Sequence, residues 1–136
     1  MRIPFAILTS GFLLATAVPV LAHHSFSAEF DRDKPISVKG TVSKVEWANP
    51  HIWFYVDVKE ENGKVTTYGF SGGPPGMLLR RGITKATLKP GDVISVDGFR
   101  AKDGSNNASS GNVTFADGRK VFAGAAEDAV NTNSRQ

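Results

Sequence analysis

The sequence predicts an all-β domain in which five strands close into a barrel, with one short helix among them. The first observation behind this prediction is the spacing of apolar residues, which alternate with polar ones over short segments, as in half-buried strands. The second is the placement of Gly, Pro and Asn, which separate these segments. The third is the pair Asn62-Gly63, a strong signal for a tight hairpin.

Residues 1–22 have the pattern of a secretory signal peptide. Met1 and Arg2 give a short basic start, residues 3–18 are mostly apolar, and Val20-Leu21-Ala22 provides small residues where a signal peptidase cuts. An uncleaved membrane anchor is the alternative, but polar residues interrupt the apolar run and Pro19 ends it. We therefore expect cleavage before His23, export to the periplasm and no contact with the membrane afterwards.

The remaining composition describes one small exported domain. Removing 22 of the 136 residues leaves 114, enough for a single domain with a modest core. Removing Arg2 leaves 15 of the 16 Lys and Arg residues against 13 Asp and Glu residues, scattered along the chain, which argues against a nucleic-acid partner. The sequence has no Cys, so any metal site must use nitrogen and oxygen ligands.

The first three strands are expected at residues 36–47, 51–59 and 64–71. In the first, the apolar pattern contains Gly40 and slips in phase after Val42, which we interpret as a bend or bulge at Gly40. The pair Asn49-Pro50 ends this strand. The second and third strands form a hairpin around a two-residue turn at Asn62-Gly63.

The second half of the chain is expected to supply a helix and two more strands. Glycines and prolines at 71–76 predict a flexible crossover into a short helix at 77–81. The fourth strand follows a Pro-Gly turn and covers residues 93–98. Residues 101–111, rich in Ser, Asn and Gly, predict a long mobile loop. The fifth strand falls between 112 and 122, with room for a small hairpin about Asp117-Gly118.

Three strands, a helix and two strands follow one another in the OB-fold, a five-stranded barrel. A β-sandwich is the structural alternative, but five strands in about 90 residues close more economically into a barrel. The expected organisation is a signal peptide at 1–22, an N-terminal arm at 23–35, the barrel at 36–124 and a disordered tail at 125–136.

The expected hairpin also predicts a ligand-binding face. A two-residue turn sets Tyr55 opposite Phe70 and Asp57 opposite Tyr68, so that one face of the ribbon is aliphatic and fills the barrel. The other face lies on the outside of strands two and three, where OB-folds bind ligands. The alternative is that this aromatic face is covered by other parts of the chain or by a second subunit. The candidate ligand-binding residues are Trp53, Tyr55, Asp57, Tyr68 and Phe70.

The three histidines of the sequence suggest a metal site. After cleavage, His23 offers both its α-amine and its ring, and docking of Phe26 and Phe30 on the barrel could bring it towards His51. With His24 as an auxiliary ligand, this nitrogen-rich set suits Cu(II) first and Ni(II) or Zn(II) next. The alternatives are incidental chelation at the terminus, and a His51 that only caps the preceding turn by hydrogen bonding.

The sequence contains one match to a catalytic motif, and its context does not fit the corresponding enzyme fold. Residues 69–73 match the G-x-S-x-G pattern of serine hydrolases, but that fold places its acid and histidine after the serine. All three histidines precede Ser71, and the chain is too short for the fold. We expect a binding protein and not an enzyme.

The mature chain contains an HHSF start, an NPH turn and an RRG…LKPGD segment. On these motifs it resembles a family of small exported bacterial proteins of unknown function, from His23 to about Gly124. The resemblance implies a Gram-negative periplasmic setting and contributes no catalytic residues. Two hypotheses follow: a periplasmic metal-binding protein, for copper first, or a metal-free interaction module whose aromatic face binds a peptide, glycan or partner protein.

Overall fold

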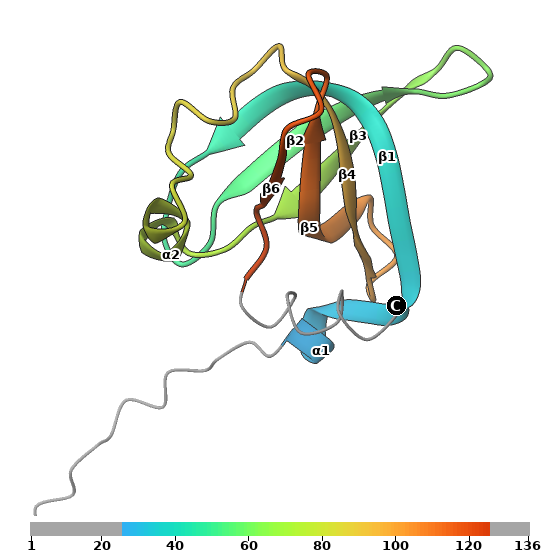
Figure 1. Ribbon diagram of the computed structural model, residues 1–136. Helices are drawn as coiled ribbons and strands as arrows, with labels where there is room; N and C mark the ends of the chain where they lie inside the picture. Colours follow the sequence, from blue (N-terminus) through green and yellow to red (C-terminus); the bar gives the residue numbers. More distant parts are fainter. Residues whose placement is uncertain (1–25, 126–136) are drawn as a thin grey trace, which may run out of the picture.

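The computed structural model describes residues 26–125, and Figure 1 shows the course of the chain. Within this range the helices are α1 (Phe26–Glu29) and α2 (Pro75–Arg80), and neither is long and apolar enough to span a bilayer. The expected signal peptide and all but the first residue of the expected tail lie outside the described residues. The strands are β1 (Phe30–Glu46), β2 (Trp53–Lys59), β3 (Val65–Ser71), β4 (Val93–Ala101), β5 (Asn107–Phe115) and β6 (Lys120–Phe122).

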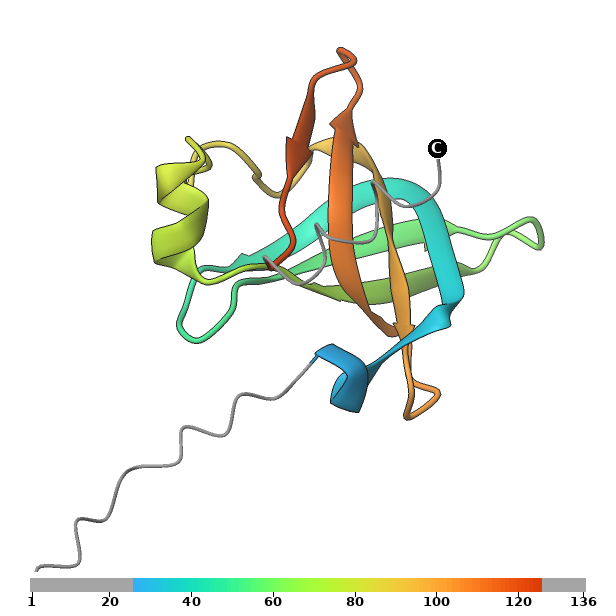
Figure 2. The same ribbon diagram turned by 60° about the horizontal axis from the view of Figure 1, so that its bottom comes forward.

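Strands β1 to β5 form a closed ring, which Figures 1 and 2 show from two directions. Neighbouring strands pair antiparallel in the order β3-β2-β1-β4-β5, and a parallel pairing between β3 and β5 closes the ring. The helix α2 follows β3, and β6 pairs with β5 as the expected hairpin about Asp117-Gly118. This is the arrangement of an OB-fold, so the predicted fold class is confirmed.

The long strand β1 pairs with two neighbouring strands, β4 and β2. It pairs with β4 over its first part and with β2 over its last part. The β1–β2 register shifts between Val42 and Lys44, so the bulge lies at Ser43, where the apolar phase slips, and not at Gly40 as expected. Gly40 has another role, because a Cβ atom there would lie 2.2 Å from the carbonyl oxygen of Asp57. Only glycine permits this close approach of β1 to β2.

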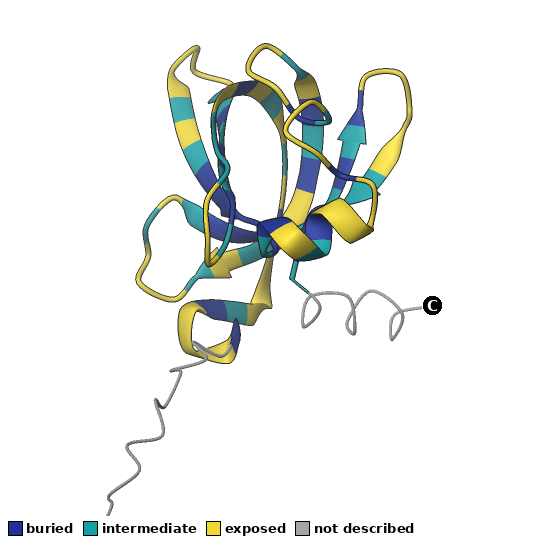
Figure 3. Cartoon of the chain, turned by 90° about the vertical axis from the view of Figure 1, so that its left-hand side faces the viewer, coloured by how far each residue is buried: buried dark blue, intermediate teal, exposed yellow. Residues whose placement is uncertain are grey.

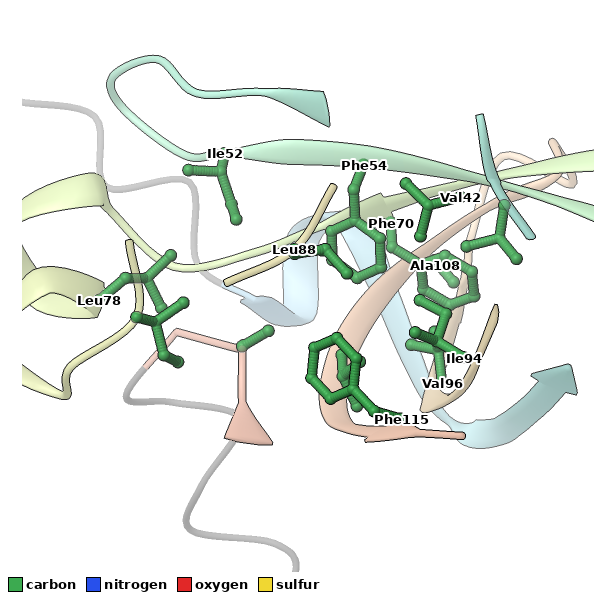
Figure 4. Packing of buried hydrophobic residues seen from close by; sticks show 14 of the residues in the cluster. Val42, Ile52, Phe54, Phe70, Leu78, Leu88, Ile94, Val96, Ala108 and Phe115 are labelled. Carbon is green, nitrogen blue, oxygen red and sulfur yellow. The ribbon is translucent and has the colours of Figure 1, made fainter. Parts of the chain in front are cut away.

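The barrel interior is a continuous apolar core. Buried and exposed residues alternate along the strands in Figure 3, and Figure 4 shows the side chains that meet inside. The rings of Phe54 and Phe70 stack at its centre with centroids 5.5 Å apart, and Leu78 of α2 and Leu88 join the same cluster. All six residues predicted inside are buried, which confirms that prediction: Val42, Ile52, Phe54, Val56, Ile94 and Val96.

The hairpin between β2 and β3 has a three-residue loop where a two-residue turn was expected. The N–H of Glu60 donates to the carbonyl of Lys64 at 2.8 Å, and the N–H of Gly63 donates to the carbonyl of Glu60 at 2.9 Å. Gly63 has a φ of 80°, so the loop is a type I turn followed by a left-handed glycine. Glu61 is thereby drawn into the loop, and the register of β3 moves by one residue.

This shift corrects the predicted ligand face. Phe70 lies opposite Phe54 and is fully buried, and Tyr68 is partly buried against the core. The prediction that Tyr68 and Phe70 share the outer face with Trp53 is therefore wrong. The two faces of β2 itself are as predicted, because half-buried and buried residues alternate from Trp53 to Asp57.

Strand β5 begins inside the segment that the sequence predicted as a long mobile loop. The hydroxyl of Ser110 donates to the carbonyl of Ser71 at 2.9 Å, and the hydroxyl of Ser109 accepts from the N–H of Phe99 at 3.1 Å. These small polar side chains are buried, yet each satisfies a backbone group close to the ring closure. The polar composition of this segment therefore led to a wrong prediction, because the segment contains the start of a buried strand. The loop between β4 and β5 spans only residues 102–106.

The glycines after β3 form a packed junction and not the expected flexible crossover. A Cβ atom on Gly72 would lie 2.5 Å from the side chain of Ile52, and one on Gly73 would lie 2.9 Å from the carbonyl oxygen of Gly124. The N–H groups of Gly72 and Gly73 donate to Ile52 and Ala123, each at 2.8 Å. Glycine is needed here for close packing between the end of β3, the start of β2 and the chain after β6.

We expect Phe54→Ala to lower the free energy of unfolding by about 3–5 kcal/mol, because it removes a fully buried ring and leaves a cavity beside Phe70. The measurement is chemical denaturation of the variant and the parent chain. Leu79→Ala is the control, since Leu79 is 53% exposed and its loss should change stability by no more than about 0.5 kcal/mol. A similar, small effect of both substitutions would contradict the described core.

Candidate functional site

A groove lies on the outer surface of the barrel, where the N-terminal arm meets the β4–β5 loop. Its volume is about 520 Å³, within the usual range for small-ligand sites. Strand β2 and the β4–β5 loop belong to the region that OB-folds use for binding. Figure 2 shows α1 beside this loop. The groove is lined by Ala28, Glu29, Phe30, Trp53, Ala101, Lys102, Asp103 and Asn107.

The first wall of the groove is the arm, which is fixed to the barrel by aromatic contacts. The rings of Phe26 and Phe30 have centroids 5.4 Å apart, and Phe26 meets the ring of Phe99 edge-on at 5.8 Å. Both arm phenylalanines are buried. The guanidinium of Arg32 covers the Phe26 ring at 4.6 Å. The arm therefore packs as part of the folded structure.

Hydrogen bonds join this wall to the β4–β5 loop. The N–H of Lys102 donates to the carbonyl of Glu29 at 2.8 Å, and the Lys102 ammonium donates to the carbonyl of Ser27. Phe30 also lies opposite Ala101 in the β1–β4 register. The two walls thus hold each other at a fixed separation.

The loop wall presents a carboxylate. The Asp103 carboxylate accepts from the N–H of Ser105 at 2.9 Å. Hydrogen bonds from the Ser105 hydroxyl and N–H hold the pKa of the Asp103 carboxyl below its ordinary value. Asp103 is therefore negatively charged at neutral pH, at a position that lines the groove.

Trp53, the half-buried first residue of β2, lines the groove between these two walls. It lies opposite Glu46 on β1 and Ser71 on β3, so both edges of its strand are paired. On β3, Gly69 leaves room for two neighbours: a Cβ atom there would lie 2.6 Å from Oδ1 of Asn107 and 3.2 Å from the Tyr55 ring. The absence of a side chain at this position brings the Asn107 amide beside Tyr55.

Tyr55 belongs to a charged cluster next to the groove. Its hydroxyl donates to Glu46 at 3.2 Å, and Lys44 donates to the other oxygen of the same carboxylate. The hydrogen bond from Lys44 lowers the pKa of the Glu46 carboxyl. Burial and the negative charge of Glu46 raise the pKa of the Tyr55 hydroxyl. At neutral pH Glu46 is ionised and Tyr55 is a neutral donor.

The structure separates the five predicted ligand residues into three groups. Trp53 lines the groove. Tyr55 and Asp57 lie on the outer face and have partners within the sheet, since Asp57 accepts from the Thr67 hydroxyl at 2.6 Å. The two aromatic residues of β3 face inward, as described above.

The predicted metal ligands are placed only in part. Nδ1 of His51 lies 3.0 Å from the carbonyl oxygen of Gly72. A carbonyl only accepts, so in the neutral ring Nδ1 carries the proton and Nε2 keeps a lone pair. His23 and His24 lie outside the described residues. Within residues 26–125, no three His, Cys, Asp or Glu side chains are grouped so that they could hold a metal ion.

Most of the groove was not predicted from the sequence. Lys102, Asp103 and Asn107 lie in the segment expected as a mobile loop, and Glu29 lies in the arm. These residues could have been predicted from the expected OB-fold, because in that fold the loop between strands four and five contributes to ligand binding. That rule places residues 102–106 beside the outer face of β2.

The strand ring defines a small OB-fold protein with a groove on its outer surface. Residues 11–110 match the family of unknown function DUF6152, and the chain belongs to this family. Among solved structures, it is similar to the mitochondrial single-stranded DNA-binding protein Rim1 of S. cerevisiae, with 9% sequence identity and a TM-score of 0.47. That match covers 64% of this chain and 94% of the other. No curated protein matches the chain significantly.

The cluster beside the groove predicts a titration that can be measured. We expect Tyr55 to ionise above the ordinary pKa of tyrosine, and Glu46→Gln to move its titration downward, because the substitution removes a neighbouring negative charge. The measurement is NMR of ring-labelled tyrosine in a Tyr68→Phe background, which leaves Tyr55 as the single tyrosine of the chain. Glu61→Gln, in the exposed β2–β3 loop, is the control. An equal effect of both Gln variants would contradict the described contact.

Proposed function

We propose that this chain is a periplasmic binding protein that holds a small polar ligand in the groove at Trp53. The observation that carries the proposal is that both walls are already fixed around the Trp53 ring, by the Phe26 contacts and by the hydrogen bonds of Lys102. A site built before its ligand arrives avoids much of the entropy cost of ordering loops on binding. The periplasmic setting rests on the signal-peptide pattern of residues 1–22.

The chemistry of the groove supports binding more than catalysis. A general acid or base works best with a pKa near the working pH. The hydrogen bonds to Asp103 move its pKa away from that value, and the Lys102 ammonium is held by the carbonyl of Ser27. Both groups are suited to orient a ligand.

The proposal is tested by titrating the full-length protein, purified as the cell processes it, with a panel of small probes followed by NMR. The panel contains chitotriose, maltotriose, trilysine and a thymidine trinucleotide. We expect at least one probe to cause saturable shifts centred on Trp53, Lys102 and Asn107, and Trp53→Ala to weaken its binding by about 10-fold or more. Leu79→Ala, on the remote α2 helix, should bind as the parent does.

A panel that produces no saturable shift at the groove would contradict the proposed site. So would a Trp53→Ala protein that remains folded and binds the same probe as tightly as the parent. Loss of the folded spectrum in this variant would show that Trp53 is structural and would also count against the proposal.

A second candidate function, copper binding, is supported by the orientation of His51. Ligating histidines commonly donate their other ring nitrogen to a backbone carbonyl, as His51 Nδ1 does to Gly72. The Nε2 atom is then available as one ligand. The α-amine and ring of a terminal His23 would supply two more nitrogens, with His24 as an auxiliary, and such a set suits Cu(II).

The copper site depends on processing, and this gives a direct test by competition titration. A protein that begins at His23 should bind Cu(II) much more tightly than one with an added Met before His23, because the added residue separates the free amine from the ring. His51→Ala should weaken binding by about 10-fold or more, equivalent to about 1.4 kcal/mol. Affinity should fall as the pH is lowered, because protons compete with the metal for the imidazole nitrogens. Equal Cu(II) affinity in all three proteins would contradict the copper site and show only incidental chelation at the terminus.

A further inference from the structure

We propose that the ligand of the groove at Trp53 is an oligosaccharide whose rings carry hydroxyl or amino groups and no acid groups. This inference rests on the proposed binding function and names the class of ligand for the same site. OB-folds bind two common classes of polymer, oligonucleotides and oligosaccharides. The lining of this groove discriminates between them.

The charges in the groove disfavour an oligonucleotide. Grooves that bind single-stranded nucleic acid combine aromatic residues with a positively charged track for the phosphates. Here the Asp103 carboxylate and the Lys102 ammonium both line the groove, so these two charges leave no excess of positive charge. The Lys102 ammonium donates to the carbonyl of Ser27, whereas the Asp103 carboxyl has a lowered pKa and stays ionised. A phosphate chain in the groove would therefore find no positively charged track, and the Asp103 carboxylate would repel it.

The same side chains suit a sugar. The ring of Trp53 offers a flat face with negative π-density, on which the polarised C–H groups of a pyranose ring can pack. Asp103 offers carboxylate acceptors, and Asn107 offers an amide with both donors and an acceptor, so neighbouring hydroxyl groups can be bound from one side. An amino group on the sugar would add attraction to the Asp103 carboxylate.

The strand pairing disfavours an extended peptide. Peptides that bind β-rich domains commonly add a strand to a free sheet edge. At the groove, β2 is paired with β1 on one side and with β3 on the other, and Asn107 on β5 pairs with Gly69 on β3. The backbone around Trp53 is already used within the barrel, so a peptide cannot add a strand at this position.

The test compares affinities of the full-length processed protein, by calorimetry or NMR titration, for neutral chitotriose, its deacetylated cationic form, anionic trigalacturonate, trilysine and a thymidine trinucleotide. We expect the neutral and the amino trisaccharides to bind most tightly and the two anionic probes to bind at least about 5-fold more weakly, as expected for a unit charge repelled at close range.

Two substitutions separate the contributions of charge and ring. Asp103→Asn should reduce the ratio of the affinities for neutral and anionic trisaccharide, whereas Trp53→Ala should weaken the binding of every sugar by about 10-fold or more. Asp117→Asn is the matched control, because this exposed carboxylate accepts from the N–H of Arg119 in the distant β5–β6 hairpin and should leave the preference unchanged.

Tightest binding of the trinucleotide or of trilysine at the groove would overturn the oligosaccharide assignment and leave the binding function standing. Equal affinity for neutral and anionic sugars in the parent protein would also overturn it. A groove that binds no member of either panel would overturn both the assignment and the function, so the two failures can be told apart.

Discussion

Closure of the barrel rests on three parallel residue pairs between β3 and β5, and the site depends on the same contact: Gly69–Asn107, Phe70–Ala108 and Ser71–Ser109. The central pair is buried on the core side. The first pair, on the outside, sets Asn107 beside the ring of Tyr55. Since β5 is anchored there, the preceding loop at 102–106 is held against β2 and the arm. The interaction that completes the core therefore also positions one wall of the groove.

The arm completes the site from the other direction by a different kind of interaction. Its phenylalanines add a small aromatic cluster with Phe99, separate from the main core, and its backbone carbonyls bind Lys102. Burial of apolar rings supplies the driving force, and the hydrogen bonds fix the spacing. The charged cluster of Lys44, Glu46 and Tyr55 covers the neighbouring outer face of β1 and β2 with groups that already have partners.

The sequence predicted the order of the elements and the two faces of β2, because both depend on local periodicity. It did not predict the register of β3, because Asn62-Gly63 fits a two-residue turn and also the end of a three-residue loop. A register shift of one residue moves every side chain of a strand to the opposite face. The start of β5 was not predicted, because Ser109 and Ser110 are polar and the partners of their hydroxyl groups are distant in the sequence. The groove escaped prediction for a related reason: Trp53 lies on a recognisable strand, but its neighbours come together only in the folded chain.

The hydrogen bond from Lys102 to Ser27 joins residues 75 positions apart. Joining residues so far apart in the sequence costs loop-closure entropy, which other contacts of the fold must offset. The groove exists only when the arm has docked on the β4–β5 loop, so a ligand that occupies it recognises only molecules in which this contact has formed. Ligand binding would then add directly to the stability of the native state, so the folded population of this small, disulfide-free domain would rise with the concentration of its ligand.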